Sequence, residues 1–181
     1  MKKIATLYEK DIYPEKQSDE HIEYSDRATG KVIVLDEENN VALVGNKQNH
    51  FLLLPGGGID DGEDIQTGII RECLEEVGCK VNILNEIGCI DDYRPRDKKH
   101  CISYCYTARV VGEKGYPKYT EDETGIGMYT KWVTLDKALE IFKEQKLELE
   151  SGNVTFYNTG FNIVRDLLFL EEAKNMGNLY G

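Results

Sequence analysis

Three glutamates, Glu72, Glu75 and Glu76, are crowded into one short segment that follows three consecutive glycines at positions 56–58. At the 100° per residue of an α-helix, these carboxylates fall within about 100° of arc and share one face. Like charges three and four residues apart destabilise a helix, and such a face is most often simply solvated. Hard divalent cations such as Mg²⁺ take oxygen ligands and bridge carboxylates to substrate phosphates, which would balance this charge. The glycines permit close backbone approach to a ligand, and the Gly57 carbonyl is a further candidate ligand.

The segment 64–77 carries the period of an amphipathic helix that would position these carboxylates. Either acidic residue at 63 or 64 can begin the helix at the positive end of its dipole, and Gly78 can end it in the left-handed conformation. Arg71 lies four residues before Glu75, so the two can pair and Arg71 can orient that carboxylate. The side opposite the glutamates is apolar and can face a sheet; it consists of Ile70, Cys73, Leu74 and Val77.

Around this helix the sequence predicts strands and two further helices. The strand candidates are apolar segments bounded by turn formers, at 29–36, 41–46, 50–55, 80–93, 99–111 and 128–134. Helical periods occupy 135–146 and 155–175. This order gives an α/β (or α+β) fold, a mixed β-sheet with helices packed on it. We expect residues 26–181 to form a single domain, with 1–25 as an N-terminal extension that adds a strand or hairpin and would serve a homodimer as readily as a monomer.

The composition excludes several classes of protein. Of the 181 residues, 40% are hydrophobic and 30% are charged, which suits one globular domain. No apolar run is long enough to span a bilayer, and the N-terminal segment lacks the apolar stretch of a secretion signal, so we expect a cytoplasmic protein without membrane partners. The net charge of −11 argues against binding to nucleic-acid backbones. The five cysteines include no C-x-x-C pair, which favours buried reduced thiols over zinc ligation.

The spacing around the glutamates resembles a known family motif. From Gly57 the chain reads glycine, five residues, Glu63, seven residues, then RECLEEVGC. This resembles the Nudix box, G-x5-E-x7-R-E-U-x-E-E-x-G-U, in which U is aliphatic. All the fixed positions match, and the departures are Cys73 and Cys79, which are apolar enough for packing. The resemblance extends in strand order over most of residues 26–145, and it implies an α/β/α sandwich with a mixed β-sheet.

The resemblance also implies an activity and a role for each residue of the box. Nudix hydrolases cleave a nucleoside diphosphate linked to another group, with water and usually Mg²⁺ or Mn²⁺. Carried onto this chain, Glu72, Glu75 and Glu76 would be metal ligands, with Glu72 or Glu76 nearest to the attacking water. Arg71 would orient Glu75, and Glu63 would support the cluster. Such ions neutralise the diphosphate and lower the pKa of water, while a carboxylate takes its proton.

Residues outside the box are candidates on weaker grounds. Many relatives add an acidic residue from a loop on the far side of the site, and Glu121 or Glu123 could be a metal ligand or the general base here. A solvated acidic loop is an equal alternative. Arg27 and Lys47 could contact phosphate, although a surface charge is the commoner role of such side chains.

The substrate and the competing functions are left open by the sequence. Pro95 lies sixteen residues after Cys79, a spacing that the family associates with ADP-ribose pyrophosphatases, but YRPRD is also ordinary turn chemistry. Candidate substrates are therefore nucleoside triphosphates or ADP-ribose and nucleotide sugars. A non-catalytic nucleotide-binding sensor on the same fold is the main alternative, although such relatives usually lose a glutamate or the arginine of the box. An acidic helix of purely structural role in an unrelated α/β protein is the third.

Overall fold

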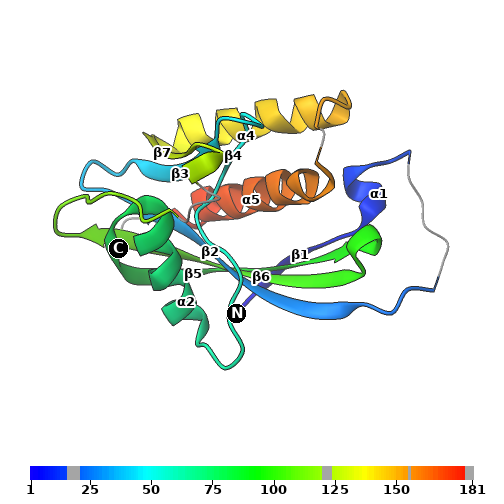
Figure 1. Ribbon diagram of the computed structural model, residues 1–181, viewed down its shortest axis with the longest axis horizontal. Coiled ribbons are helices and arrows are strands. Elements are labelled where there is room, and N and C mark those ends of the chain that lie inside the picture. The colour runs from blue at the N-terminus through cyan, green and yellow to red at the C-terminus, as the bar shows by residue number, and fades with distance from the viewer. Residues whose placement is uncertain (16–20, 120–123, 155, 178–181) are drawn as a thin grey trace.

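The computed structural model describes residues 1–15, 21–119, 124–154 and 156–177 (Figure 1). The elements follow in the order β1 (Lys3–Leu7), α1 (Glu9–Ile12), β2 (Ser25–Leu35), β3 (Val41–Asn46), β4 (Leu52–Leu53), α2 (Ile65–Glu72), the π-helical turn η1 (Cys73–Val77), β5 (Lys80–Arg94), the 3₁₀ turn η2 (Pro95–Asp97), β6 (Lys99–Val111), β7 (Met128–Val133), α4 (Leu135–Glu150) and α5 (Tyr157–Met176). No helix in these described ranges is long and apolar enough to cross a membrane.

The strands of the described residues form one mixed sheet. Its order is β1-β5-β6-β2-β3-β4, and β7 pairs with β3 outside this path. The long β5–β6 hairpin is antiparallel, whereas β2 runs parallel to β6 and β1 runs parallel to β5. The strand β1, which lies within residues 1–25, is thus an edge strand of the main sheet. The prediction of a mixed sheet is confirmed.

The helices cover both faces of the sheet. Figure 1 shows α4 and α5 together on one side and α2 on the other. Because side chains alternate along a strand, β2 contributes residues to the cores on both faces of the sheet. Ile33 and Leu35 pack in the core beneath α4 and α5, whereas Val32 and Val34 pack in the core beneath α2. The molecule is therefore the three-layer α/β/α sandwich that the Nudix resemblance implied.

The register of β2 on β6 decides which polar residues meet on the α5 side of the sheet. Arg27 lies opposite Cys101, and Lys31 lies opposite Cys105. By alternation, Arg27, Thr29 and Lys31 point to the same face as Ile33. α5 packs on that face, where Lys31 is buried, Thr29 is half-buried and Arg27 is exposed.

The acidic helix differs from the regular α-helix predicted over 64–77. Asp64 caps its start by accepting hydrogen bonds from the amides of Gln66 and Thr67, and Gly78 ends it with a φ of 75°. Between these ends the α-helix gives way after Glu72 to the π-helical turn η1. A π turn inserts an extra residue into the helical ring, so the glutamates follow a wider turn than the sequence period indicated.

Candidate active site

A glycine loop, residues 56–58, lies along β2 on the side away from β6. The Gly30 amide donates to the Gly57 carbonyl at 3.0 Å, and the Val32 amide donates to the Pro55 carbonyl at 3.2 Å. Gly56 has a φ of 122°, and a Cβ at this position would lie 2.1 Å from the carbonyl oxygen of Gly30. Only glycine therefore allows the loop to pass this close to the strand.

Two of the three glutamates at 72–76 contact the glycine loop directly. A Cβ on Gly57 would lie 2.5 Å from Glu72 Oε1, so the missing side chain leaves room for the Glu72 carboxylate. The Gly56 amide donates to Glu76 Oε2 at 2.7 Å. The Glu75 side chain is more open, with 47% of its surface exposed. The helix and the glycine loop are thus joined through Glu72 and Glu76.

Arg71 contacts three carboxylates of the box, those of Glu63, Glu72 and Glu75. It donates to both Glu63 oxygens at 3.1 Å, to Glu72 Oε1 at 2.8 Å and to the Gly58 carbonyl at 3.1 Å. The expected pair with Glu75 is present at 3.5 Å and is the longest of these contacts. The Arg71 hydrogen bonds, helped by the Asp60 amide, hold the pKa of the Glu63 carboxyl below its ordinary value. Arg71 therefore braces Glu63 and Glu72 more closely than Glu75.

The side chains of the box fit a divalent cation by donor type. Glu72, Glu75 and Glu76 offer carboxylate oxygens along one turn, which is the chemistry that Mg²⁺ and Mn²⁺ prefer. Within the described ranges, however, no three acidic, histidine or cysteine side chains converge into a formed metal cluster. Two reasons are visible: Arg71 draws Glu72 toward itself, and Glu76 accepts the Gly56 amide. The Gly57 carbonyl already accepts one hydrogen bond, which leaves its second lone pair for a ligand.

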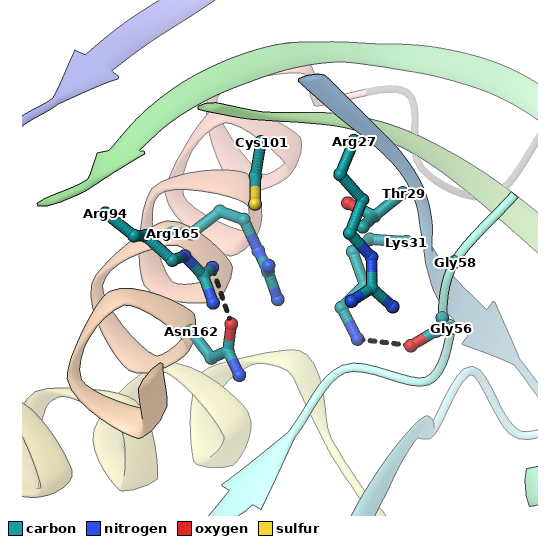
Figure 2. Close-up of a pocket in the computed structure, with 10 residues that line it drawn as sticks. Arg27, Thr29, Lys31, Gly56, Gly58, Arg94, Cys101, Asn162 and Arg165 are labelled. Atoms are coloured by element: carbon teal, nitrogen blue, oxygen red, sulfur yellow. Dashed lines mark hydrogen bonds between the residues drawn. The ribbon is translucent and has the colours of Figure 1, made fainter. Parts of the chain in front are cut away.

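A cavity of about 200 Å³ lies between the glycine loop and α5. Four cationic side chains line it, Arg27 and Lys31 from β2, Arg94 from the end of β5 and Arg165 from α5, and we call it the cationic pocket. Figure 2 shows their charged ends gathered around the same space. Lys31 is only 7% exposed and donates to the carbonyls of Leu54 at 2.8 Å and of the glycine loop at 2.6 Å. Burial lowers the pKa of this amine, an effect that nearby Asp166 opposes.

Of the other predicted site residues that the structure describes, Arg27 lies in the cationic pocket and Lys47 does not. Arg27 lines the cationic pocket beside Gly58, and its contact with phosphate stays a prediction. Lys47 is exposed after β3, with its stem against Gly127, and does not line the pocket. Glu121 and Glu123 lie outside the described residues, so their roles stay predictions.

Sequence reasoning missed three of the pocket cations, Lys31, Arg94 and Arg165. The available signal was a charge next to apolar residues: Lys31 directly precedes the apolar residues VIVL of β2, and Arg165 interrupts the apolar residues of α5. Pro95, which the sequence offered as a substrate marker, opens η2 directly after Arg94. Pro95 therefore follows directly after Arg94, the pocket residue at the end of β5.

Comparison with known proteins places this site in a family. A model of the NUDIX domain matches residues 26–156. The chain is similar to a Bacillus subtilis (strain 168) protein, provisionally named an 8-oxo-dGTP diphosphatase, with 30% identity over 146 residues, 76% of this chain and 91% of the relative. It is also similar to an ADP-ribose pyrophosphatase of Methanocaldococcus jannaschii, with 27% identity over 82 residues, 44% of this chain and 48% of that protein.

The solved structures agree on the fold. A NUDIX hydrolase from Nitrosomonas europaea is similar over 72% of this chain and 91% of its own, with a TM-score of 0.54 and 17% identity. The family model and the Bacillus subtilis relative show that the chain belongs to the Nudix family, as the box that begins at Gly57 predicted. The expectation of a Nudix-type pyrophosphohydrolase is confirmed at the level of the family and agrees with the names of the two relatives.

Proposed function

We propose that this protein is a divalent-metal-dependent hydrolase that cleaves the anhydride bond of a nucleoside diphosphate linked to another group. Water adds across the P–O–P bond, one phosphorus gains the hydroxyl, and the other leaves with the bridging oxygen. The products are a nucleoside monophosphate and the phosphorylated partner group. Nucleoside triphosphates and ADP-ribose or nucleotide sugars are the candidate substrates, and the names of the two relatives support both classes.

In this proposal Glu72, Glu75 and Glu76 hold Mg²⁺ or Mn²⁺, with the Gly57 carbonyl as a further ligand. The ion would neutralise the diphosphate and make water more acidic. Glu72 or Glu76 accepts the proton of the attacking water, and a carboxylate within hydrogen-bond reach of that water suffices for this task. Glu72, Glu76 and Gly57 lie where the acidic turn meets the glycine loop, and Arg71 contacts both Glu72 and Glu75, which supports assigning the four residues to one centre.

Arg71 acts as a positioning residue and Glu63 as its support. Arg71 touches Glu72 directly and is itself fixed by two bonds to Glu63, so the pair limits the motion of a proposed ligand. Glu123, as base, and Glu121, as ligand, remain proposals on the loop. The described residue that precedes this loop, Tyr119, donates to the Glu76 carbonyl at 3.2 Å, which supports a loop that starts beside the site.

One observation carries the proposal: the contact of Glu72 and Glu76 with a glycine loop that can take no side chain at Gly56 and has none at Gly57. A solvated acidic face would not require such a loop. The acidic cluster and the backbone of the glycine loop therefore form one site, an arrangement suited to a phosphate group and its counter-ion.

The test is a panel of nucleoside triphosphates, ADP-ribose and nucleotide sugars incubated with Mg²⁺, Mn²⁺ or EDTA, with products separated by chromatography. The Glu76→Gln variant and the control Glu148→Gln, an exposed glutamate on α4, are run alongside. We expect metal-dependent release of a nucleoside monophosphate that is lost in Glu76→Gln and kept in Glu148→Gln. Tight nucleotide binding without turnover on any panel member would instead favour the sensor.

A further inference from the structure

The cationic pocket contains more positive charge than its carboxylate neighbours neutralise. Arg94 is paired with Asp92, which is fully buried, through contacts of 2.5 Å and 3.2 Å. Arg165 is paired with its neighbour Asp166 at 2.8 Å, and Asp166 also accepts the amide of Leu54. These two arginines are each matched by one carboxylate.

The other two cationic side chains, Lys31 and Arg27, are not paired with a carboxylate of the described residues. Lys31 donates to two backbone carbonyls and forms no ion pair within the described part of the chain. Arg27 forms neither a hydrogen bond nor an ion pair with any residue that the structure describes, and its guanidinium lies against Gly58. Of the four cationic side chains that line the pocket, only two are therefore paired with a carboxylate that the structure describes, in a chain whose net charge is −11. Lys31 is buried, and a buried cation without a carboxylate partner is costly, so this arrangement indicates a site for an anion.

The lining of the pocket favours an anion over a nucleobase. Nucleobases bind by stacking on aromatic side chains, and the residues that line this pocket in the described chain include no aromatic ring. Guanidinium groups instead match the oxygens of phosphate or carboxylate with paired hydrogen bonds. Arg165 is 3% exposed, and its Nη2 makes no well-formed hydrogen bond to the described residues although it lies 2.8 Å from Asp166 Oδ1. A donor is thus left for a ligand.

The pocket is separated from the proposed catalytic glutamates only by the glycine loop. Gly57 lines the pocket and, at the same time, contacts the Glu72 carboxylate. The volume of about 200 Å³ compares with about 30 Å³ for one molecule of liquid water, so a phosphate with a few attached atoms fits. One substrate can therefore place its scissile diphosphate at the glutamates and a second group in the pocket.

We propose that the cationic pocket binds a second anionic group of the substrate, a phosphate monoester in a part of the molecule remote from the bond that is cleaved. This inference rests on the proposed hydrolase function and narrows its substrate class to diphosphates that carry an additional phosphate. Arg27 and Lys31 supply the unmatched charge, and Arg94 and Arg165 form the rest of the cationic wall. Substrates without the extra phosphate leave this charge uncompensated.

The test compares pairs of diphosphates that differ by one phosphate monoester, NADP⁺ against NAD⁺ and coenzyme A against dephospho-coenzyme A, with Mg²⁺ or Mn²⁺. The variants are Arg27→Gln, chosen because Arg27 is exposed and its loss should spare the fold, and the control Lys143→Gln, an exposed cation on α4. We expect the wild type and the control to favour the phosphorylated member by about 10- to 100-fold in kcat/KM. In Arg27→Gln this ratio should fall toward one.

A second arm uses inorganic phosphate in EDTA, where the glutamates lack a cation to attract it. Increasing phosphate, against chloride at equal ionic strength, should raise the unfolding temperature of the wild type and of Lys143→Gln but not of Arg27→Gln. Equal cleavage of both members of each pair would overturn the inference even if free phosphate binds. If no diphosphate is cleaved at all, the proposed hydrolase fails, and the phosphate arm alone then decides whether the pocket is an anion site: no shift that depends on Arg27 overturns it.

Discussion

Adjacent glycines of the loop should respond to alanine in opposite ways. In Gly56→Ala the new Cβ would lie 2.1 Å from the Gly30 carbonyl oxygen, and the φ of 122° is one that side-chain-bearing residues rarely adopt. Neither problem can be relieved by a side chain, so the backbone must move. We expect a loss of about 3 kcal/mol or more in the free energy of unfolding. For a chain of this size, that lowers the unfolding temperature by about 6 to 12 °C.

In Gly57→Ala the new Cβ would meet the end of a flexible side chain, Glu72 Oε1, at 2.5 Å. The carboxylate must retreat by about 0.9 Å to reach the 3.4 Å of an ordinary contact, which a side-chain rotation can supply. We therefore expect the free energy of unfolding to change by about 1 kcal/mol or less. A displacement of this size at a reacting centre costs on the order of 100-fold in rate, so kcat should fall by about that factor.

The assay is thermal unfolding of both variants, together with kcat for metal-dependent hydrolysis at saturating metal. The reasoning predicts a large loss of stability in Gly56→Ala, and a rate defect without a loss of stability in Gly57→Ala. Wild-type kcat in Gly57→Ala would refute the assignment of Glu72 to the reacting centre. An equal loss of unfolding temperature in the two variants would refute the distinction between backbone and side-chain contacts.

Three further predictions concern other parts of the molecule. Arg71→Lys keeps the charge but not the planar group that reaches Glu63 and Glu72, so kcat should fall about 10-fold or more in the steady-state assay while the fold, by circular dichroism, is retained. Asp36→Asn should lower the free energy of unfolding by about 1.5 kcal/mol, measured in urea at pH 7. Burial acts to raise the pKa of the Asp36 carboxyl, but hydrogen bonds from Lys114 and from a backbone amide outweigh burial and lower this pKa below 3.8. The stability from this charge is present above pH 3.8 and is lost as the pH falls through the lower folded pKa, so wild type and variant should converge only below pH 3.8. Burial raises the pKa of four of the five cysteine thiols. A thiol reagent at pH 8 should therefore react readily with about one cysteine per chain, the half-buried Cys89, and with all five only after unfolding. Rapid reaction of the native protein at several thiols would contradict the buried positions.

Most of the sheet could be predicted because its strands are apolar segments bounded by turn formers. The segments 41–46 and 99–111 were predicted with the bounds of β3 and β6. The segment 50–55 was predicted as one strand, but only Leu52–Leu53 is a strand, because the chain then leaves β3 and pairs with β2 through Pro55 and the glycine loop. Contacts between distant segments decide such boundaries, and no local pattern reports them.

The acidic Nudix box and the cationic pocket differ in how much of each could be predicted from the sequence. The acidic half is contiguous, so the spacing from Gly57 to Cys79 was enough to predict the Nudix box. The cationic half is assembled from β2, β5 and α5, and its residues meet only through the parallel β2–β6 register and the packing of α5. The π turn after Glu72 was also invisible, since the sequence period fits an α-helix equally well.

The most direct test of the central claim is whether the box glutamates hold a divalent cation. Electron paramagnetic resonance can count free Mn²⁺ during titration of the wild type, Glu72→Gln, Glu76→Gln and the control Glu148→Gln, without any substrate. The account predicts saturable Mn²⁺ binding by the wild type and the control, weakened about 10-fold or more in both box variants. Equal Mn²⁺ binding by all four proteins, or none by the wild type, would contradict it.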